Sequence, residues 1–569
     1  MQEKWLYKTI PNLLGGIDKS KQPDALADNQ CVTLKNVKIT NGQLVNRFGY
    51  TEYGDFDGFV TKATILKLYQ FNRRNGTSEL MLITTASMYK YNSVLSKWLI
   101  VSGFFHTTTT AAYVAGATVI AITADPGFVI GNTLCIVLDN TDLHIATISN
   151  IAGLNITIST GIPTGRTVAS GARVYRPLSH SGSASKMVSV VTIPGSDLMV
   201  FTNGVDAPRM WNGTSCEPLT GATGYICRSL VLYNTALFLL GTIEGGVSYP
   251  QRVRRSNQTD PTDWTGGTAG YDDLLDSSDA VICGALLGPY LIIYKSRSII
   301  RGSFVGSSGL NYSFETTITH EGAITAASVV TVKDRHVFIG HNNVYEYVGD
   351  FTIKPIGEQI RPTLFGDDKD VNTTYDHIMF LLYIETFDEV WLFYPSSTNL
   401  SASCNRTLRY KVDTGVWYEV NSVNTWTTGA VYRTENEEGE LNFHLCDYLL
   451  KSVFAYDPTA VTDAYGYPIP FTVETKDFIM PDGRFRVDMV EMNIQGTSVL
   501  LEYSTDGGTT YTTMATITQA TQIKIRVHKQ FVCDRVRFRW TGTASNFQLS
   551  WFGLSYKIEN LYISGSNTY

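Results

Sequence analysis

Short runs in which apolar and polar residues alternate recur along nearly the whole chain, and this pattern predicts β-strands. Helix-period apolar stripes are almost absent; the best candidate for a short helical turn is Pro23–Asn36. Turn residues separate the strands: Asn41 and Gly42 divide Val37–Val45 and suit a type I′ hairpin. We therefore expect an all-β fold.

A two-part unit repeats along the chain, in which a buried strand is followed by a strand that ends in an aromatic hairpin. From the second copy onward the starts lie roughly 40 to 55 residues apart, in the range of four-stranded propeller blades. Radial packing would bury the apolar face that each sheet alone leaves in water, so the repeat predicts a β-propeller of about seven blades. Unrelated hairpins in β-sandwiches are the alternative. The copies start at Leu80–Thr84, Leu198–Phe201, Ala236–Leu239, Tyr290–Ile293, His336–Ile339, Val390–Phe393 and Leu441–His444.

Two segments depart from this repeat. The first begins with a threonine run, Thr107–Thr110, that predicts a linker, and continues with compact alternation typical of a small β-barrel inserted into the first blade. The second has longer alternating strands, including Val487–Ile494 and Val499–Ser504, that predict a β-sandwich. The expected domains are 1–104 (N-terminal segment and first blade), 105–178 (inserted barrel), 179–467 (remaining blades) and 468–569 (C-terminal sandwich).

Composition and charge narrow the possible functions. Charged residues make up 17 % of the 569 residues, below the roughly 25 % of an average soluble domain, and the net charge is −7. Tight, sequence-independent wrapping of DNA needs a clustered basic surface, which this chain does not offer in bulk. The eight cysteines contain no CxxC pair and are predicted to be small buried residues in a reducing compartment.

Neither an export signal nor a membrane span is predicted. Met1–Trp5 lacks the basic-then-apolar pattern of a signal peptide. The longest apolar run, Ala280–Tyr294, is broken by Gly284, Gly288 and Pro289 and is too short to cross a bilayer. We expect a soluble protein made in the cytoplasm.

The search for catalytic, cofactor-binding and metal-binding motifs yields no assignment. Metalloprotease, P-loop, nucleophile-elbow and dinucleotide signatures are absent. His336 and His341 lie five residues apart across a predicted turn and form a weak metal candidate. Two acidic clusters lack calcium-loop spacing and are interpreted as solvated loops. We assign no catalytic, cofactor-binding or metal-binding residue and expect neither cofactor nor enzyme activity. The clusters are Asp272, Asp273, Asp276 and Asp279, and Asp367, Asp368 and Asp370.

The segment Ser504–Tyr511 resembles the Asp-box of sialidases and other propellers. Its predicted role is a structural hairpin turn, in which Asp506 accepts backbone hydrogen bonds, Gly508 tolerates a positive φ and Tyr511 packs beneath. A sialidase would also need an arginine cluster and a nucleophile pair.

Three groups of basic residues with aromatic neighbours are candidate interaction surfaces. In the third group the arginines alternate with Val536, Phe538 and Trp540, so they line one face of a strand whose other face is buried. Such a face could meet an acidic partner subunit or nucleic acid; strand solubility and edge protection are the alternative. The groups are Arg252, Arg254 and Arg255; Lys295, Arg297 and Arg301; and Arg535, Arg537 and Arg539.

An ordered set of residues near the N-terminus carries a family resemblance: Pro11–Asp18, Gln22–Asp24, Asn36, Val37, Gly42, Leu44, Arg47 and Gly49. It is similar to the start of the tail nozzle proteins of short-tailed bacteriophages (podophages), also called tail hub or tail tubular protein B. Phe48 departs from that pattern, which usually has proline there. Further similarity lies at Pro250–Arg254, Asn257, Pro261, Trp264, Tyr294–Ile299 and between Glu502 and Arg539.

The resemblance implies a propeller-based structural virion protein of the viral tail. Six copies would form a ring, a homohexamer, below the head-to-tail connector, and the ring would form the distal DNA channel that stays closed until ejection. The implied partners are other copies of the chain, the connector (adaptor), tail fibres or a tail needle, and genomic DNA passing without sequence-specific binding. Because ring closure requires two different contact faces, we expect them on the inserted barrel and the terminal sandwich.

Two other function classes stay open at this point. A receptor- or glycan-binding tail protein would use exposed tyrosine and tryptophan side chains as stacking platforms. A propeller glycoside hydrolase would need two carboxylates roughly 5 to 9.5 Å apart.

Overall fold

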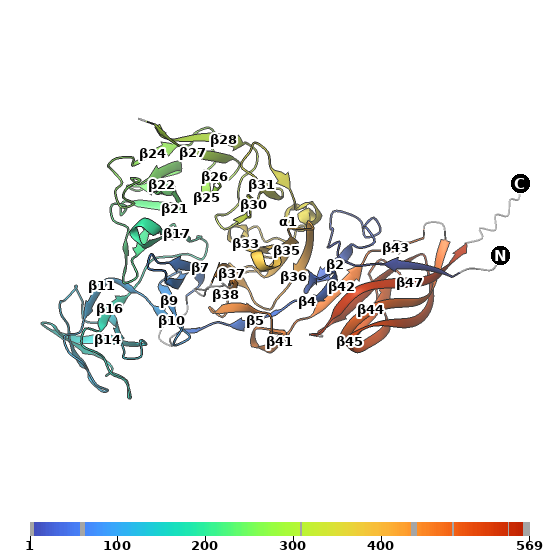
Figure 1. Cartoon of the computed structure of the whole chain (residues 1–569), viewed down its shortest axis with the longest axis horizontal. Coiled ribbons are helices and arrows are strands. Elements are labelled where there is room, and N and C mark those ends of the chain that lie inside the picture. Colours follow the sequence, from blue (N-terminus) through green and yellow to red (C-terminus); the bar gives the residue numbers. More distant parts are fainter. Residues whose placement is uncertain are drawn as a thin grey trace, which may run out of the picture.

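The computed structural model is built almost entirely of β-strands and turns (Figure 1). The structure describes residues 5–56, 63–307, 310–433, 441–480, 483–543 and 545–560; Met1–Lys4, part of the segment searched for an export signal, lie outside them. Among the described residues, no helix is long and apolar enough to cross a membrane. The helical segments are α1 (Arg361–Phe365) and the 3-10 turns η1 (Pro194–Ser196), η2 (Glu358–Ile360), η3 (Asp376–Ile378), η4 (Glu385–Phe387) and η5 (Ala464–Gly466).

Seven antiparallel blades form a β-propeller, which confirms the predicted fold class. The first strand of each blade packs against the first strand of the next, in the order β7, β17, β21, β25, β29, β33, β37, and β37 returns to β7. The predicted repeat starts all fall on the second strand of a blade, because this strand is flanked on both sides and is the most completely buried. The first blade is completed by a short parallel strand, β6 (Asp55–Phe56).

The blade strands have the following bounds. The first three blades are β7 (Ile65–Asn72), β8 (Ser78–Thr84), β9 (Met88–Asn92), β10 (Lys97–Ile100); β17 (Ser189–Ile193), β18 (Leu198–Thr202), β19 (Arg209–Trp211), β20 (Cys216–Pro218); and β21 (Tyr225–Tyr233), β22 (Ala236–Glu244), β23 (Val247–Arg255), β24 (Gly270–Asp273). The next three are β25 (Val281–Leu287), β26 (Tyr290–Lys295), β27 (Ile299–Ser307), β28 (Leu310–Ile318); β29 (Val329–Val332), β30 (Arg335–Ile339), β31 (Val344–Tyr347), β32 (Lys354–Pro355); and β33 (Phe380–Ile384), β34 (Glu389–Tyr394), β35 (Arg406–Lys411), β36 (Val416–Val420).

The seventh blade combines strands from both ends of the sequence. Its fourth strand is β5 (Gly49–Glu52), which pairs antiparallel with β39. The chain thus closes the propeller with a strand made long before the rest of that blade. The other strands are β37 (Trp426–Arg433), β38 (Leu441–Asp447) and β39 (Val453–Asp457), followed by the small hairpin β40 (Thr462–Asp463) and β41 (Tyr467–Pro468).

A six-stranded barrel lies between the first and second blades, not within the first blade as the sequence suggested. It begins at Ser102, and Thr107 and Thr108 belong to its first strand rather than to a linker. Hydrogen bonds from Thr110 N to Ala121 O (3.0 Å) and from Thr123 N to Thr108 O (2.9 Å) join the two edges of the sheet. The strands are β11 (Ser102–Thr108), β12 (Val119–Ala121), β13 (Thr133–Val137), β14 (Leu143–Ala152), β15 (Asn155–Ile158) and β16 (Arg173–Pro177).

The terminal domain is a two-layered β-sandwich with strands from both chain ends. The two predicted strands near residues 487 and 499 are one 22-residue strand, β44. It pairs with β47 along its first part and with β46 along its last, so it passes from one layer into the other. Trp540 and Phe552, from β46 and β47, face each other with ring centroids 5.2 Å apart. The later strands are β42 (Phe471–Thr475), β43 (Phe478–Ile479), β44 (Gly483–Ser504), β45 (Thr512–Cys533), β46 (Arg535–Gly542) and β47 (Gln548–Asn560).

The N-terminal residues belong to this terminal domain rather than to the first blade. The strands β1 and β4 pair with β47, and β2 pairs with β42. The segment Pro23–Asn36, predicted as a helical turn, forms turns and strand β2 instead, because its apolar residues pair with the terminal sheet. The predicted hairpin is confirmed, with positive φ at Asn41 and Gly42. The strands are β1 (Leu6–Ile10), β2 (Cys31–Lys35), β3 (Val37–Thr40) and β4 (Gln43–Asn46).

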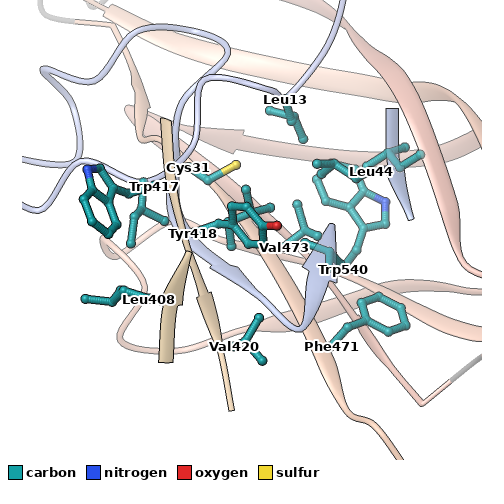
Figure 2. Close-up of a cluster of buried hydrophobic side chains, with 14 of the residues drawn as sticks. Leu13, Cys31, Leu44, Leu408, Trp417, Tyr418, Val420, Phe471, Val473 and Trp540 are labelled. Atoms are coloured by element: carbon teal, nitrogen blue, oxygen red, sulfur yellow. The ribbon is translucent and has the colours of Figure 1, made fainter. Parts of the chain in front are cut away.

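One hydrophobic core runs from the fifth and sixth blades into the terminal domain (Figure 2). Trp417 and Tyr418 of the sixth blade, Cys31 of β2 and Val473 of β42 are fully buried in it. A parallel pairing of Lys35 with Glu419 also makes the sheet of the sixth blade continuous with the terminal sheet. All eight cysteines are buried, as predicted.

Candidate functional site: two exposed surfaces on either side of a buried brace

The junction between the propeller and the terminal domain is built around Arg47, whose side chain is fully buried. Its Nη1 and Nη2 donate to the two carboxylate oxygens of Asp463 at 2.8 and 2.7 Å, and its Nε donates to Asn36 Oδ1 at 3.0 Å. The remaining donors reach the carbonyls of Phe48 and Asn421. All five guanidinium N–H groups are therefore satisfied, which is what a buried ion pair needs in order to be retained.

Asn36 extends this junction to a third segment. It adopts a left-handed conformation (φ +56°) between β2 and β3, where asparagine is tolerated. Its Nδ2 donates to the carbonyl of Pro470 at 2.7 Å, and its Oδ1 accepts a second bond from the backbone N–H of Asn421. We call Asn36, Arg47, Asn421, Asp463 and Pro470 the brace. It ties the N-terminal strands to the sixth blade and to the start of the terminal domain.

Two positions beside the brace require glycine, because the backbone of another segment approaches each of them closely. Gly16 has φ +69°, and a Cβ there would lie 2.6 Å from the carbonyl oxygen of Trp417. A Cβ on Gly49 would lie 1.8 Å from the carbonyl oxygen of Thr462. Gly42, by contrast, also has a positive φ but faces open space. Arg47, Asn36, Gly16 and Gly49 were singled out from sequence, and the structure gives all four a role in joining domains.

A second buried charge lies next to the brace and has no counterpart in the sequence interpretation. Arg409 is 1 % exposed, and its guanidinium carbon lies 3.4 Å from the ring centroid of Trp391. Glu389 accepts hydrogen bonds from Trp391 Nε1 (2.9 Å) and from the hydroxyl of Tyr418 (2.7 Å). Burial, together with the positive charge of Arg409, lowers the pKa of Lys38 to about 8. The burial of Arg409 could not be predicted from the sequence, because this residue lies in a strand with an ordinary alternating pattern.

The barrel exposes several large apolar side chains on one end of the molecule. Its own core is formed mainly by isoleucine, leucine and valine, so the exposed residues are additional to what folding requires. Exposed apolar surface of this kind marks candidate interaction sites. The exposed side chains are Phe104, Val114, Val119, Val129, Ile130 and Leu154.

The terminal domain exposes a long sheet edge. Among the described strands, β45 pairs with β44 alone, so one side of its 22 residues offers unpaired backbone groups. The half Thr512–Thr521 contains no charged residue, although edge strands are ordinarily protected by charge. The other half carries Lys524 and Arg526, which both contact Glu491. The uncharged half of β45 is therefore the second candidate surface.

Most of the basic residues predicted from sequence form ion pairs within the chain, including Arg535 with Asp477 at 3.6 Å, whereas the side chain of Arg297 has no carboxylate partner among the described residues. Arg537 Nε donates to Asp477 at 2.7 Å and its Nη1 to Glu474 at 3.0 Å, while Arg539 donates to Glu502 at 2.8 Å. Strand β46 lies between β44 and β42, so edge protection is not the reason for these arginines. The other groups pair as Arg252–Asp273, Arg254–Glu244, Arg255–Asp272, Lys295–Asp279 and Arg301–Glu315.

Most residues of the acidic clusters and both histidines form structural contacts, whereas Asp367 and Asp368 are exposed. Asp272, Asp273 and Asp279 form the ion pairs just described, and Asp370 accepts a bond from Ser397 Oγ at 2.8 Å. His336 is buried between the hydroxyl of Tyr294 and the carbonyl of Leu286, while the backbone N–H of His341 donates to Glu321. Within the described ranges, no group of three potential ligands is arranged to hold a metal ion.

The Asp-box segment forms the predicted turn. Asp506 Oδ1 accepts the backbone N–H groups of Thr509 and Thr510 at 3.0 and 2.9 Å, and Gly508 has φ +92°. The hydroxyl and the backbone N–H of Thr510 hold the pKa of Asp506 well below its usual range. Tyr511 lies under the guanidinium of Arg539, 3.4 Å from ring centroid to Cζ. The turn begins strand β45.

Comparisons with known proteins give no family assignment. No protein family model and no curated protein matches the chain. Several solved structures match at low similarity, and at these TM-scores the likeness carries no argument about function. An exo-β-1,3-galactanase from Phanerochaete chrysosporium with bound galactose is 9 % identical over 66 % of this chain and 97 % of that chain, with a TM-score of 0.25. A fungal alcohol oxidase of the AA5 family in complex with copper is 9 % identical over 77 % and 98 % (TM-score 0.33), and the AfRom2 CNH domain is 9 % identical over 72 % and 99 % (TM-score 0.28).

Proposed function

We propose that the chain is a non-enzymatic structural subunit of a ring, the tail nozzle or hub of a short-tailed bacteriophage. The observation that carries this proposal is the placement of the two candidate surfaces. The brace holds the terminal domain on one side of the propeller, and the barrel projects from the opposite side (Figure 1). A subunit of this kind presents two different surfaces in a fixed relation, which is what heterologous ring closure requires.

The residues that resemble nozzle proteins support the same proposal. Asn36, Arg47, Gly16 and Gly49 all lie at the junction that fixes the terminal domain to the propeller. The resemblance therefore concerns the part of the molecule that sets the relation between the two surfaces. In this proposal, six copies form the ring, which contacts the connector above and tail fibres or a needle at its periphery.

The charge distribution suits a channel through which DNA passes without being held. The chain carries a net charge of −7, and eight of its nine predicted basic residues pair with a carboxylate; Arg297 is the exception among the described residues. Phosphate binding would require those carboxylates to be displaced. DNA would therefore slide along such a wall with few lasting contacts.

Immunogold electron microscopy of phage particles tests the assignment to the tail. An antibody against this chain should label the tip of the short tail stub. Label on lateral appendages would contradict the nozzle proposal and favour a receptor- or glycan-binding protein. Absence of label on the particle would contradict a virion role altogether, and a glycosidase turnover assay would follow.

A charge placed on the uncharged edge of β45 tests the interface. Thr516 and Thr518 are exposed on this strand, and Thr516→Lys with Thr518→Lys should prevent strand addition by a neighbouring copy. The matched control is Thr373→Lys with Thr374→Lys, two exposed residues of a propeller loop. Rings counted by negative-stain microscopy should be lost in the first variant and retained in the second. Equal ring formation would remove β45 from the interface.

A further inference from the structure

A cavity of about 330 Å³ lies at the centre of the propeller, at the end where the first strands of several blades begin. This volume falls in the range of small-molecule sites, roughly 300 to 1,000 Å³. Residues from five consecutive blades and their connections line it, so it belongs to the propeller as a whole. Its lining includes Lys186, Arg228, Ile243, Ile282, Thr325 and His377.

The inner wall of the propeller has an unusual charge distribution. The seven innermost strands are all described, and they contain Lys67, Arg228 and Arg433 but no aspartate or glutamate. The chain as a whole has more acidic than basic residues and a net charge of −7. The innermost strands therefore contain cations but no carboxylate.

The cations at this cavity lack the carboxylate partners found elsewhere in the chain. Arg228 donates from Nη1 to the carbonyl of Val281 at 3.0 Å, and no described carboxylate lies within ion-pairing distance of Arg228 or Lys186. His377 Nε2 is buried, and no described atom forms a hydrogen bond with it. Burial in this region lowers the pKa of Arg228, as expected for a cation short of compensating charge.

We propose that the axial cavity binds a small anion that carries a carboxylate or phosphate group. Arg228 and Lys186 would supply charge-assisted hydrogen bonds to the anionic group, and His377 also lines the cavity. Ile243 and Ile282 provide an apolar wall for a carbon skeleton of about monosaccharide size. The site does not depend on ring assembly, because all of its residues come from one chain.

Isothermal titration calorimetry of the full-length protein tests this site. The probes are D-glucuronate and inorganic phosphate, with D-glucose as the neutral match for glucuronate and sodium chloride at equal ionic strength as the salt control. We expect the two anions, but neither control, to bind with saturable heat. Arg228→Met should weaken anion binding about tenfold or more, because a hydrogen bond to a charged group is worth about 1.5–3 kcal/mol.

Control variants separate loss of the site from loss of the fold. Arg433→Met makes the same substitution on another innermost strand, at a residue paired with Glu385 at 2.6 Å, and should leave the affinity unchanged. Lys186 is exposed, so Lys186→Met serves if Arg228→Met fails to fold. If neither anion binds more tightly than its control, or if binding survives in a folded Arg228→Met, Lys186→Met double variant, the proposal is wrong.

Discussion

The two domains attached to the propeller differ in how they are joined to it. The terminal domain shares a hydrophobic core with the fifth and sixth blades, continues the sheet of the sixth blade and is fixed by the buried Arg47–Asp463 pair. The barrel has a separate core and contacts the first blade mainly through Cys135, Ile145 and Tyr175. The first junction is part of the fold of the propeller, whereas the second is an interface between two nearly independent units.

This difference follows from the path of the chain. The barrel is formed by one continuous segment whose ends meet, since the backbone N–H of Leu178 donates to the carbonyl of Val101 at 2.9 Å. Such a segment can be removed or replaced without disturbing the propeller strands that precede and follow it in the chain. The terminal domain instead contains strands from both ends of the sequence, so separating it from the propeller would break several sheets at once.

The largest expected effect is at the brace. Arg47→Met leaves Asp463 as an unpaired buried charge and should lower the free energy of unfolding by about 3–5 kcal/mol. Urea unfolding measures this loss. Arg433→Met is the matched control, because its ion pair with Glu385 is exposed and worth at most about 1 kcal/mol. Similar losses in the two variants would show that the brace does not fix the terminal domain.

A smaller effect is expected from the glycine beside the sixth blade. Gly16→Ala adds a Cβ 2.6 Å from the carbonyl oxygen of Trp417, so the backbone must move in addition to the strain of its positive φ. Gly42→Ala has the same φ strain but no close contact, and should cost about 1–2 kcal/mol. Gly16→Ala should cost at least about 1 kcal/mol more in the same unfolding measurement. Equal losses of unfolding free energy in the two variants would mean that Gly16 does not lie so close to the carbonyl oxygen of Trp417 in solution.

A buried histidine in the seventh blade makes the stability of the protein depend on pH. His444 is packed against the rings of Tyr53 and Tyr432, and burial lowers its pKa from 6.5 to about 3. The unfolded chain therefore binds a proton at this residue between about pH 6.5 and 3 while the folded chain does not, and stability falls as the pH is lowered through that window. The slope is about 1.4 kcal/mol per pH unit for one proton.

Replacing this histidine should remove that part of the acid sensitivity. Between pH 6 and 4.5, His444→Gln should lose less unfolding free energy than the parent, whatever its stability at neutral pH. His528→Gln, at an exposed position of β45, should follow the parent curve. Parallel curves for all three proteins would show that His444 is already protonated in the folded chain.

The smallest effect is expected from removing the barrel. Replacing Gly103–Arg176 with an Asn-Gly turn joins strand ends that already pair, because Ser102 lies opposite Pro177. The remaining propeller and terminal domain should stay folded, with a thermal midpoint within a few degrees of the parent in calorimetry. Loss of the cooperative transition would contradict the view of the barrel as a separable unit. If the barrel is one of the two interaction surfaces, the shortened protein should also fail to form rings.

Much of the fold could be predicted because its signals are local. Each second blade strand is a short apolar run flanked by turn residues, and all seven were found from that pattern alone. The hairpin at Asn41 and Gly42 and the Asp506 turn were predicted for the same reason, since their hydrogen bonds lie within a few residues.

The brace could be predicted only in part because its contacts are long-range. Arg47 was noticed, but Asp463 lies 416 residues further along and sits in an unremarkable sequence. The arginines of β46 were a candidate interaction surface, with strand solubility and edge protection as the alternative, but Asp477 and Glu474 approach them from a neighbouring strand and connection. The pairing of β1–β4 with the terminal domain was not predicted, because the alternation of apolar and polar residues in a strand does not show which other strand it pairs with.

The position of β5 has a consequence for how the protein is made. This strand leaves the ribosome early, but its partner β39 begins only at Val453, about 400 residues later. At the usual 5–20 residues per second, the strand waits roughly 20–80 s before it can complete a sheet. The propeller thus cannot close until most of the chain has been synthesised, and a chain that ends before β39 leaves its seventh blade incomplete. Closure of the propeller therefore depends on chain length, because it requires a chain that has been translated at least as far as β39.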